Sequence, residues 1–192
     1  MARYLVFLFL LVSSSVNAVS VYEMTNGQLT AITEVDVNGV LYDVRFANGS
    51  FDSIYGTPAN LTFTNSADAF AASNALLSML GTNIVGSDGL VYDFEANTSL
   101  VNGCANYVYC DMLTTYGLFV DTLGNERAAH VYARNFYDVA SDFSMTGSLI
   151  RSTTTAAWST YAVWTASVPT PEAGSLMLLG LGLIGIVLAR RR

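Results

Sequence analysis

Apolar and polar residues alternate along two short segments that meet at Asn38-Gly39. This dipeptide favours a two-residue β-turn because both of its positions tolerate a positive φ. The alternation predicts a hairpin with one almost wholly apolar face. A slip of one residue would expose that face, so the pattern also fixes the register. The predicted pairs, counted from the turn, are Val37–Val40, Val35–Tyr42, Thr33–Val44 and Ala31–Phe46.

The opposite face of this hairpin carries charges. The predicted register sets Glu34 directly opposite Asp43, with Asp36 nearby, and like charges placed across two strands are mildly destabilising. Two interpretations are open. Clustered carboxylate oxygens suit a weak surface calcium site, or the face is solvated and its repulsion is offset by Arg45. We favour the second, because Arg45 lies diagonally close to Glu34 in this register.

A helix is predicted after the hairpin. Asn65 or Ser66 can cap its first turn, Asp68 suits the positive end of the helix dipole, and Gly81 is placed to end it. Residues at helical spacing form one stripe that can pack on a sheet. The members of this stripe are Phe70, Ser73, Leu76, Leu77 and Leu80.

Further strands are predicted towards the C-terminus. A second hairpin is expected around Gly124-Asn125, and it is flanked by single strands on either side. The expected strands are 90–95, 116–122, 128–137 and 158–164. Because strands predominate and one helix is well marked, we expect an α+β domain: a mainly antiparallel β-sheet with one packed helix.

The N-terminus is typical of a cleavable signal peptide. An uninterrupted apolar run of eight residues, Leu5 to Val12, follows a single arginine. As a helix this run spans about 12 Å, against about 30 Å for the hydrocarbon core of a bilayer. Small residues precede the expected cut, which we place between Ala18 and Val19. Residues 1–18 are therefore predicted to form a signal helix that is removed.

The C-terminus is typical of a short membrane anchor. Residues 175–189 carry no charge, and Arg190, Arg191 and Arg192 follow them. The run is shorter than the ~20 residues of a stable span. We predict a C-terminal transmembrane helix with its arginines in the cytoplasm and the body of the protein outside it.

The whole tail resembles a known sorting signal. Val168-Pro169-Thr170-Pro171-Glu172, an apolar segment with interleaved glycines and a final arginine cluster resemble the PEP-CTERM signal of Gram-negative bacteria. That resemblance implies that an exosortase, a membrane transpeptidase, cleaves near the prolines and releases the protein towards the cell surface or exopolysaccharide matrix. The usual motif has glutamate between its prolines, where this chain has Thr170. The body also resembles, more loosely, uncharacterised proteins of this class through residues 37–44, 70–80 and its two cysteines.

These segments give three predicted parts: a signal peptide at 1–18, an exported α+β domain at 19–167, and a sorting and anchor segment at 168–192.

The domain holds four arginines, no lysine and fourteen acids, so its net charge is 4 − 14 = −10. Nucleic acid is an improbable partner, because phosphate binding needs clustered basic residues. Cys104 and Cys110 are the only cysteines. We expect them to form a structural disulfide in an oxidising compartment.

No catalytic arrangement stands out in the sequence. His130 is the only histidine, it lies in a strand-like run, and no Gly-x-Ser-x-Gly motif is present. Fourteen acids leave two-carboxylate glycosidase chemistry open, but the sequence marks no particular pair. No cofactor and no resident metal are expected. Many aromatic side chains could form a carbohydrate-stacking platform, although strand alternation makes most of them candidates for the core. They are Tyr107, Tyr109, Tyr116, Tyr132, Tyr137, Tyr161, Trp158 and Trp164.

The sequence therefore leaves two hypotheses for the function. The first is a non-enzymatic protein of the cell surface or extracellular matrix, structural or polysaccharide-binding. The alternative is a small secreted hydrolase that uses a carboxylate pair. The expected partners are the Sec translocon and signal peptidase in transit, an exosortase, exopolysaccharide and, for the precursor, the inner membrane. The expected location is the inner membrane with a periplasmic body, then the cell surface or matrix.

Overall fold

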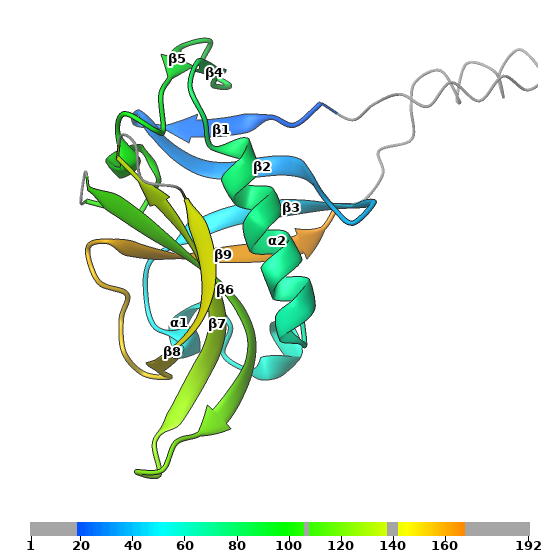
Figure 1. Ribbon diagram of the computed structural model, residues 1–192, viewed down its shortest axis with the longest axis vertical. Helices are drawn as coiled ribbons and strands as arrows, with labels where there is room; N and C mark the ends of the chain where they lie inside the picture. Colours follow the sequence, from blue (N-terminus) through cyan, green and yellow to red (C-terminus); the bar gives the residue numbers. More distant parts are fainter. Residues whose placement is uncertain (1–18, 106–107, 138–141, 168–192) are drawn as a thin grey trace, which may run out of the picture.

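Seven strands form one sheet in the computed structural model, which describes residues 19–105, 108–137 and 142–167 (Figure 1). The strand order is β1-β2-β3-β9-β6-β7-β8, and all neighbours are antiparallel except β6 and β9. The strands are β1 Tyr22–Thr25, β2 Gln28–Val37, β3 Val40–Ala47, β6 Tyr109–Val120, β7 Glu126–Phe136, β8 Phe143–Ile150 and β9 Ser159–Ala166. This confirms the predicted mainly antiparallel α+β class for the described residues.

The remaining elements are small, apart from one helix. A second sheet consists of β4, Ile84–Val85, and β5, Val91–Tyr92. The helical elements are α1 Phe51–Ile54, η1 Pro58–Asn60, α2 Ser66–Met79 and η2 Thr98–Leu100. The long helix α2 lies on one face of the large sheet, where it contacts β6, β7, β8 and β2. The predicted signal helix and transmembrane helix lie outside the described residues.

The first hairpin forms as predicted near its turn. Asn38 and Gly39 have φ values of 55° and 84°, and Val37–Val40 and Val35–Tyr42 are paired. Further from the turn the predicted register is wrong. The strands shift between Ile32 and Val35, so that Ile32 pairs with Val44.

A β-bulge at Glu34 causes this shift. Glu34 has a φ of 58°, and its backbone N–H donates to the Asp43 carboxylate at 3.0 Å. The extra residue turns the fully buried Ile32 into the core in place of the predicted Thr33, and beyond a second register shift, opposite Glu23 and Met24 of β1, Leu29 is fully buried as well. The larger aliphatic side chains remove more apolar surface from water, which favours the bulged register over the regular one.

Helix α2 begins where the sequence predicts. The Asn65 side chain accepts a hydrogen bond from the backbone N–H of Asp68 at 3.0 Å, which caps the first turn. The helix ends at Met79, slightly before the predicted Gly81. Its buried residues are Ala69, Ala72, Ser73 and Leu76, so the buried face is rotated from the predicted stripe. Small alanine side chains on that face let the helix lie close to the sheet.

The second hairpin is also confirmed, with β6 and β7 on either side of Gly124, whose φ is 83°. The strand predicted at 90–95 is reduced to β5, and Phe94 turns into the core instead of continuing it. The edge strands β1 and β8 were not predicted. Each pairs on one side only within the large sheet, so alternation of buried and exposed side chains is weak in their sequences.

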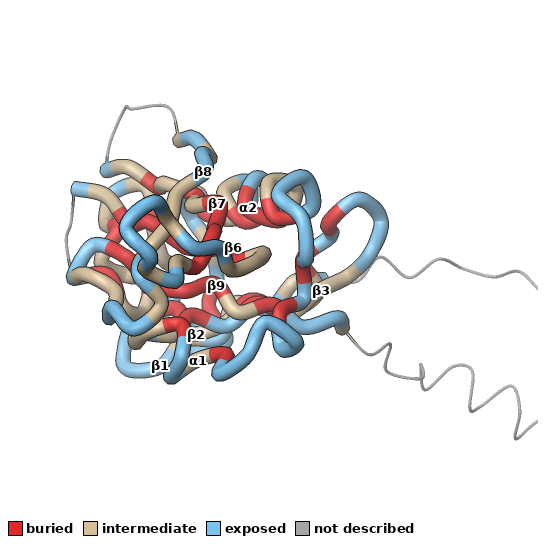
Figure 2. Tube along the Cα trace, turned by 90° about the horizontal axis from the view of Figure 1, so that it is seen from below, coloured by how far each residue is buried: buried red, intermediate tan, exposed pale blue. Residues whose placement is uncertain are grey.

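The core has two unequal parts, one on each face of the large sheet. The larger lies between the sheet and α2 and includes Ile32, Val44, Leu76, Met112 and Trp164. The smaller lies on the opposite face beneath α1 and consists of Phe51, Tyr55, Leu61, Leu113, Ala128 and Tyr161. The buried segments, red in Figure 2, accordingly gather towards the interior of the folded chain. Because α1 is only one turn long, part of this second face stays partly open to solvent.

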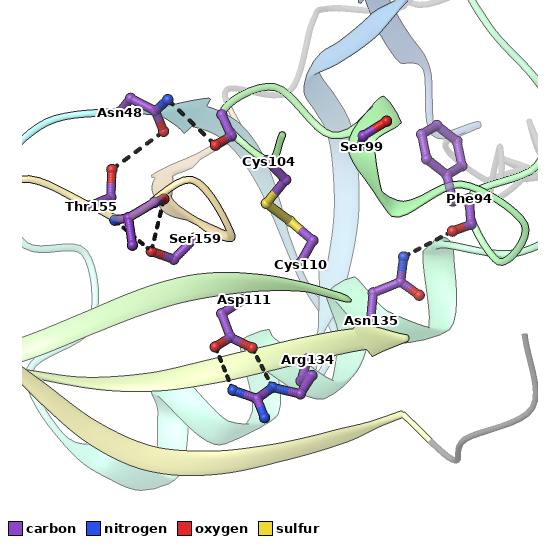
Figure 3. The surroundings of a disulfide bond; sticks show 12 residues. Asn48, Phe94, Ser99, Cys104, Cys110, Asp111, Arg134, Asn135, Thr155 and Ser159 are labelled. Atoms are coloured by element: carbon purple, nitrogen blue, oxygen red, sulfur yellow. Dashed lines mark hydrogen bonds and ion pairs between the residues drawn. A yellow bond between two sulfur atoms is a disulfide. The ribbon is translucent and has the colours of Figure 1, made fainter. Parts of the chain in front are cut away.

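A disulfide joins Cys104, after η2, to Cys110 in β6 (Figure 3). Both cysteines are almost fully buried in the larger core. The bond ties the long segment between α2 and β6 to the centre of the sheet. This is the structural role that the sequence predicts, and both cysteines described are used in it.

Replacing both Cys104 and Cys110 by alanine should lower the free energy of unfolding by about 2 kcal/mol, because closing a loop of this size restricts the unfolded chain. Urea unfolding, followed by tryptophan fluorescence with and without reductant, measures the effect. Reductant should shift the midpoint of the unaltered protein and leave that of the variant unchanged. Equal midpoints for the two proteins under oxidising conditions would contradict a stabilising role.

Candidate functional site

Strands β6, β7 and β8 place one arginine and four aromatic rings on the sheet face opposite α2. Alternation along β7 separates its side chains: Val131 and Ala133 point to the larger core, while Tyr132 and Arg134 point to the other face. Cross-strand pairing then brings Asp111 of β6 and Phe143 of β8 to either side of Arg134. The set Tyr109, Asp111, Tyr132, Arg134, Phe136 and Phe143 is called the aromatic–arginine surface below.

The centre of this surface is a two-bond ion pair. Arg134 donates from Nε to Asp111 Oδ1 at 2.6 Å and from Nη2 to Oδ2 at 2.7 Å (Figure 3). The side chains are 24% and 10% exposed. The hydrogen bonds to Asp111 raise the pKa of Arg134 above its ordinary value. Such a fork holds the guanidinium plane in one orientation and leaves the pair with no net charge.

The rings surround that guanidinium group. Its central carbon lies 4.4 Å from the ring centroid of Tyr109 and 5.3 Å from that of Tyr132. The corresponding distances to Phe136 and Phe143 are 5.7 and 5.6 Å. Contacts at these distances are attractive because the guanidinium carbon lies over the negatively polarised face of each ring. Phe143 is 38% exposed, and the other three rings are half-buried.

The surface still has unused hydrogen-bonding capacity. Asp111 occupies Nε and one position of Nη2, so the N–H groups of Nη1 stay free of it. The hydroxyl groups of Tyr109 and Tyr132 have no hydrogen-bond partner among the described residues. Rigid strands thus present ring area beside free donors and acceptors. A sugar ring, with apolar faces and a rim of hydroxyl groups, has matching chemistry.

The structure divides the aromatic residues that the sequence singles out. Tyr109 and Tyr132 belong to the surface, whereas Tyr161 and Trp164 are buried in the core as expected. Tyr116 packs against the core, Trp158 and Tyr137 are exposed, and Tyr107 lies outside the described residues. Sequence reasoning missed Phe136, Phe143 and Arg134. The period-two run Tyr132-Arg134-Phe136 was the available signal.

The predicted sorting segment begins where the body ends. Ser167 follows β9, and its backbone N–H donates to the carbonyl of Leu41 at 3.0 Å. Its hydroxyl group donates to Asp43 Oδ1 at 2.6 Å. The tail therefore begins at a residue fixed to β3, and Pro169 comes only two residues later in the sequence.

Most predicted processing residues lie outside the described part of the chain: Ala18, Val168, Pro169, Thr170, Pro171, Glu172, Arg190, Arg191 and Arg192. Val19, after the expected signal cleavage, is described and is 76% exposed. Among the residues described, no helix has the length and apolar character needed to span a membrane.

The calcium interpretation gains no support. Asp36 accepts a hydrogen bond from the Gly39 backbone N–H at 2.6 Å, and the bulge at Glu34 occupies Asp43 as described above. These carboxylates therefore satisfy local backbone groups. Over residues 19–105, 108–137 and 142–167, no three acidic, histidine or cysteine side chains are grouped to hold a metal ion.

Among the acids that the structure describes, no pair is likewise singled out for hydrolysis. A cleft of about 430 Å³ contains Asp52 and Glu126, but Arg151 binds both carboxylates and ties α1 to the β7–β8 region. Burial raises the pKa of Glu95 and of Asp142, which accepts a bond from the Phe136 N–H at 3.0 Å. A larger cleft of about 580 Å³, between β6, β7, β8 and Thr64, is lined by no acidic or basic side chain.

His130 is a core residue, only 3% exposed in β7. It faces Thr115 of β6 and Gly147 of β8. A side chain at Gly147 would come within 2.9 Å of His130 Nε2, so the glycine makes room for the imidazole. Burial lowers the pKa of His130 to about 4, and its Nδ1 has no hydrogen-bond partner among the described residues. These surroundings favour a neutral structural histidine over a catalytic base.

Comparison with known proteins identifies the tail. Residues 169–192 match the sequence model of the PEP-CTERM protein-sorting motif. The chain thus ends in the sorting signal that its residues resemble, and the match holds with Thr170 between the prolines. This motif implies a membrane-anchored precursor, processing by an exosortase and export towards the cell surface. No curated protein and no solved structure matches the chain.

Acid should destabilise the protein through His130. Its pKa is lower in the folded state than the ordinary 6.5. The stability gained from neutral imidazole is therefore complete above pH 6.5 and is lost as the pH falls towards 4. The full difference is on the order of 3 kcal/mol.

The variant His130→Gln isolates this effect, because it cannot gain a proton while the carboxylates still titrate. Urea unfolding at pH 7 and pH 4.5 should show a smaller loss of stability for the variant than for the unaltered protein. Parallel losses in the two proteins would show that His130 does not control the acid response.

Proposed function

We propose that this chain, which ends in a PEP-CTERM motif, is a non-enzymatic polysaccharide-binding protein of the cell surface or extracellular matrix. The signal peptide directs the precursor through the Sec translocon, and the tail holds it in the inner membrane until an exosortase removes the anchor. The released body then associates with exopolysaccharide. The single observation that carries the sorting step is the match over residues 169–192.

The position of the tail supports this order of events. The last described hydrogen bonds, from Ser167 to Leu41 and Asp43, come just before the prolines. A cut near Pro169–Pro171 leaves every strand of the body intact. Proline has no backbone N–H to donate to a strand ladder, and it disfavours helical geometry in the residue before it, so a motif with two prolines suits a protease-like active site.

The aromatic–arginine surface supports the binding step. Its rings lie on neighbouring strands of one sheet, so little conformational entropy is lost when a ligand settles on them. The Arg134–Asp111 pair adds directional hydrogen bonds without net charge. Because the predicted body carries a charge of about 4 − 14 = −10, polymers of neutral sugars are favoured over strongly acidic ones.

The processing proposal predicts the mass of the mature protein. In a cell that has an exosortase, the chain should begin at Val19 and end near Pro171, and it should leave the inner membrane. Replacing Pro169 and Pro171 together by alanine should retain the tail, because the recognised segment is lost. Mass spectrometry of each cell fraction measures both outcomes. Intact Arg192 on unaltered inner-membrane protein would show a simple anchor instead.

The binding proposal predicts a loss of affinity when exposed ring area is removed. Phe143→Ala should weaken binding to purified exopolysaccharide by about two- to thirteenfold, the effect expected from 0.5–1.5 kcal/mol per aromatic contact. Tyr109→Ala should act in the same direction. Quantitative pull-down of the exported protein gives the affinity.

Trp158→Ala is the matched control for this experiment, because Trp158 is 45% exposed but lies outside the aromatic–arginine surface. Its affinity should equal that of the unaltered protein. Equal affinity in Phe143→Ala and Tyr109→Ala would reject the surface as the binding site. Turnover of the polymer during the assay would instead support a hydrolase.

A further inference from the structure

The two edge strands of the large sheet, β1 and β8, differ in whether other described residues cover them. At β1, the backbone N–H of Ser87 donates to the Tyr22 carbonyl at 2.8 Å, and the Ser87 hydroxyl accepts from the Met24 N–H at 3.1 Å. Gly86 forms a parallel bridge with Tyr22. The β4–β5 hairpin therefore covers this edge with hydrogen bonds of its own.

The β8 edge has no such cover among the described residues. Its eight residues, Phe143 to Ile150, pair with β7 along their whole length, and no described strand pairs with their outer side. Phe143, Met145 and Ile150 are each at least 38% exposed. The strand contains no charged residue and no proline, which are the usual means of blocking an exposed edge.

We propose that β8 binds β8 of a second copy of this chain, antiparallel and across a two-fold axis at Thr146. Residues that face each other in an antiparallel pair share one side of the sheet, so the axis must preserve the alternation of β8. An axis at Thr146 does so. It sets Phe143 opposite Leu149 of the second copy, and Ser144 opposite Ser148 of the second copy.

This register makes the strand complementary to itself. On one face it joins aromatic to aliphatic side chains, and on the other it joins Ser to Ser and Thr146 to its own equivalent. Both kinds of cross-strand pair are stabilising. Leu149 already packs against the smaller core, so the contact with Phe143 extends an apolar surface that exists in each copy.

Charge also favours a second antiparallel copy. Copies of an acidic body repel each other over most of their surface, whereas β8 itself is uncharged. The strand is preceded by Asp142 and followed by Arg151. Antiparallel pairing brings the acidic end of one strand beside the basic end of the other, and parallel pairing would bring like charges together.

The assembly closes at two copies. Because β1 is covered by the β4–β5 hairpin and β8 is used in the contact, the joined sheet has no open edge of comparable length among the described strands. A two-fold axis perpendicular to the sheet keeps both aromatic–arginine surfaces on one side. Two linked sites then bind a repeating polymer more tightly than one.

Cysteine cross-linking tests this contact in the full-length chain. Thr146→Cys places the new thiol beside its own equivalent, and the native cysteines are already joined to each other. In an oxidising compartment the variant should run as a disulfide-linked dimer on a non-reducing gel and as a monomer after reduction. Leu123→Cys, at a residue 84% exposed in the β6–β7 turn, is the matched control.

The register can be tested in the same way. Ser144→Cys alone and Ser148→Cys alone should cross-link poorly, because position 144 of one copy lies opposite position 148 of the other. The double variant should form dimers. The proposal fails if Thr146→Cys gives no more dimer than Leu123→Cys. It also fails if the cross-linked product contains a different protein or forms a ladder of higher oligomers.

A charge substitution gives an independent measurement. Thr146→Lys places two lysines opposite each other at the two-fold axis, where their like charges repel. The dimer fraction of the full-length protein in mild detergent should therefore fall at least tenfold. Leu123→Lys should leave the fraction unchanged. A single cooperative urea unfolding transition shows that the substituted chain is folded. A purely monomeric unaltered protein at micromolar concentration would overturn the proposal.

Discussion

The pairing of β9 on both of its sides holds the two halves of the sheet together. The last strand of the body lies in the middle of the sheet, antiparallel to β3 and parallel to β6. Without it, the β1–β3 group and the β6–β8 group would share only contacts through α2 and the loops. The side chains of β9 also enter both parts of the core: Trp164 on the helix side and Tyr161 on the other. The sheet is complete only when the residues directly before the sorting segment are in place.

The charged residues of the body divide into those that form ion pairs and those that do not. Three of its four arginines form ion pairs among the described residues, with Asp121, with Asp111 and, for Arg151, with both Asp52 and Glu126. All three arginines lie in or next to β7 and β8. The few bases therefore tie together the half of the sheet that carries the aromatic–arginine surface. Other described acids, such as Glu23, Asp36 and Asp68, are exposed to solvent.

Local signals in the sequence predicted the elements that local chemistry determines. Asn38-Gly39 specifies a turn by its backbone preference, and Asn65 specifies a helix start by its side-chain oxygen. The bulge at Glu34 depends instead on a competition between Thr33 and Ile32 for the core, which is settled only when α2 is present. Edge strand β8 has one paired side, so its pattern carries little information.

The sorting segment and the aromatic–arginine surface also differ in how much of each the sequence reveals. The sorting segment is a linear motif whose meaning does not depend on the fold, so residues 168–172 and 190–192 could be recognised directly. The aromatic–arginine surface is assembled from three strands that are far apart in the chain. Its members become neighbours only through the register that sets Arg134 between Asp111 and Phe143. Sequence alone gave a pool of aromatic residues without saying which of them meet.

The direction of β9 relates the two ends of the proposed function. Because β9 runs parallel to β6, the start of β9 lies beside Asp111 of the aromatic–arginine surface, while the tail leaves from its other end. Ser159 and Ala166 are the first and last of the eight residues of this strand, a distance of about 23 Å. A precursor held at the membrane by its tail therefore presents this surface at the far end of the strand from its anchor. Under the proposed function, binding to polysaccharide would not have to await cleavage, and a cut beyond Ser167 would leave the residues of this surface in place.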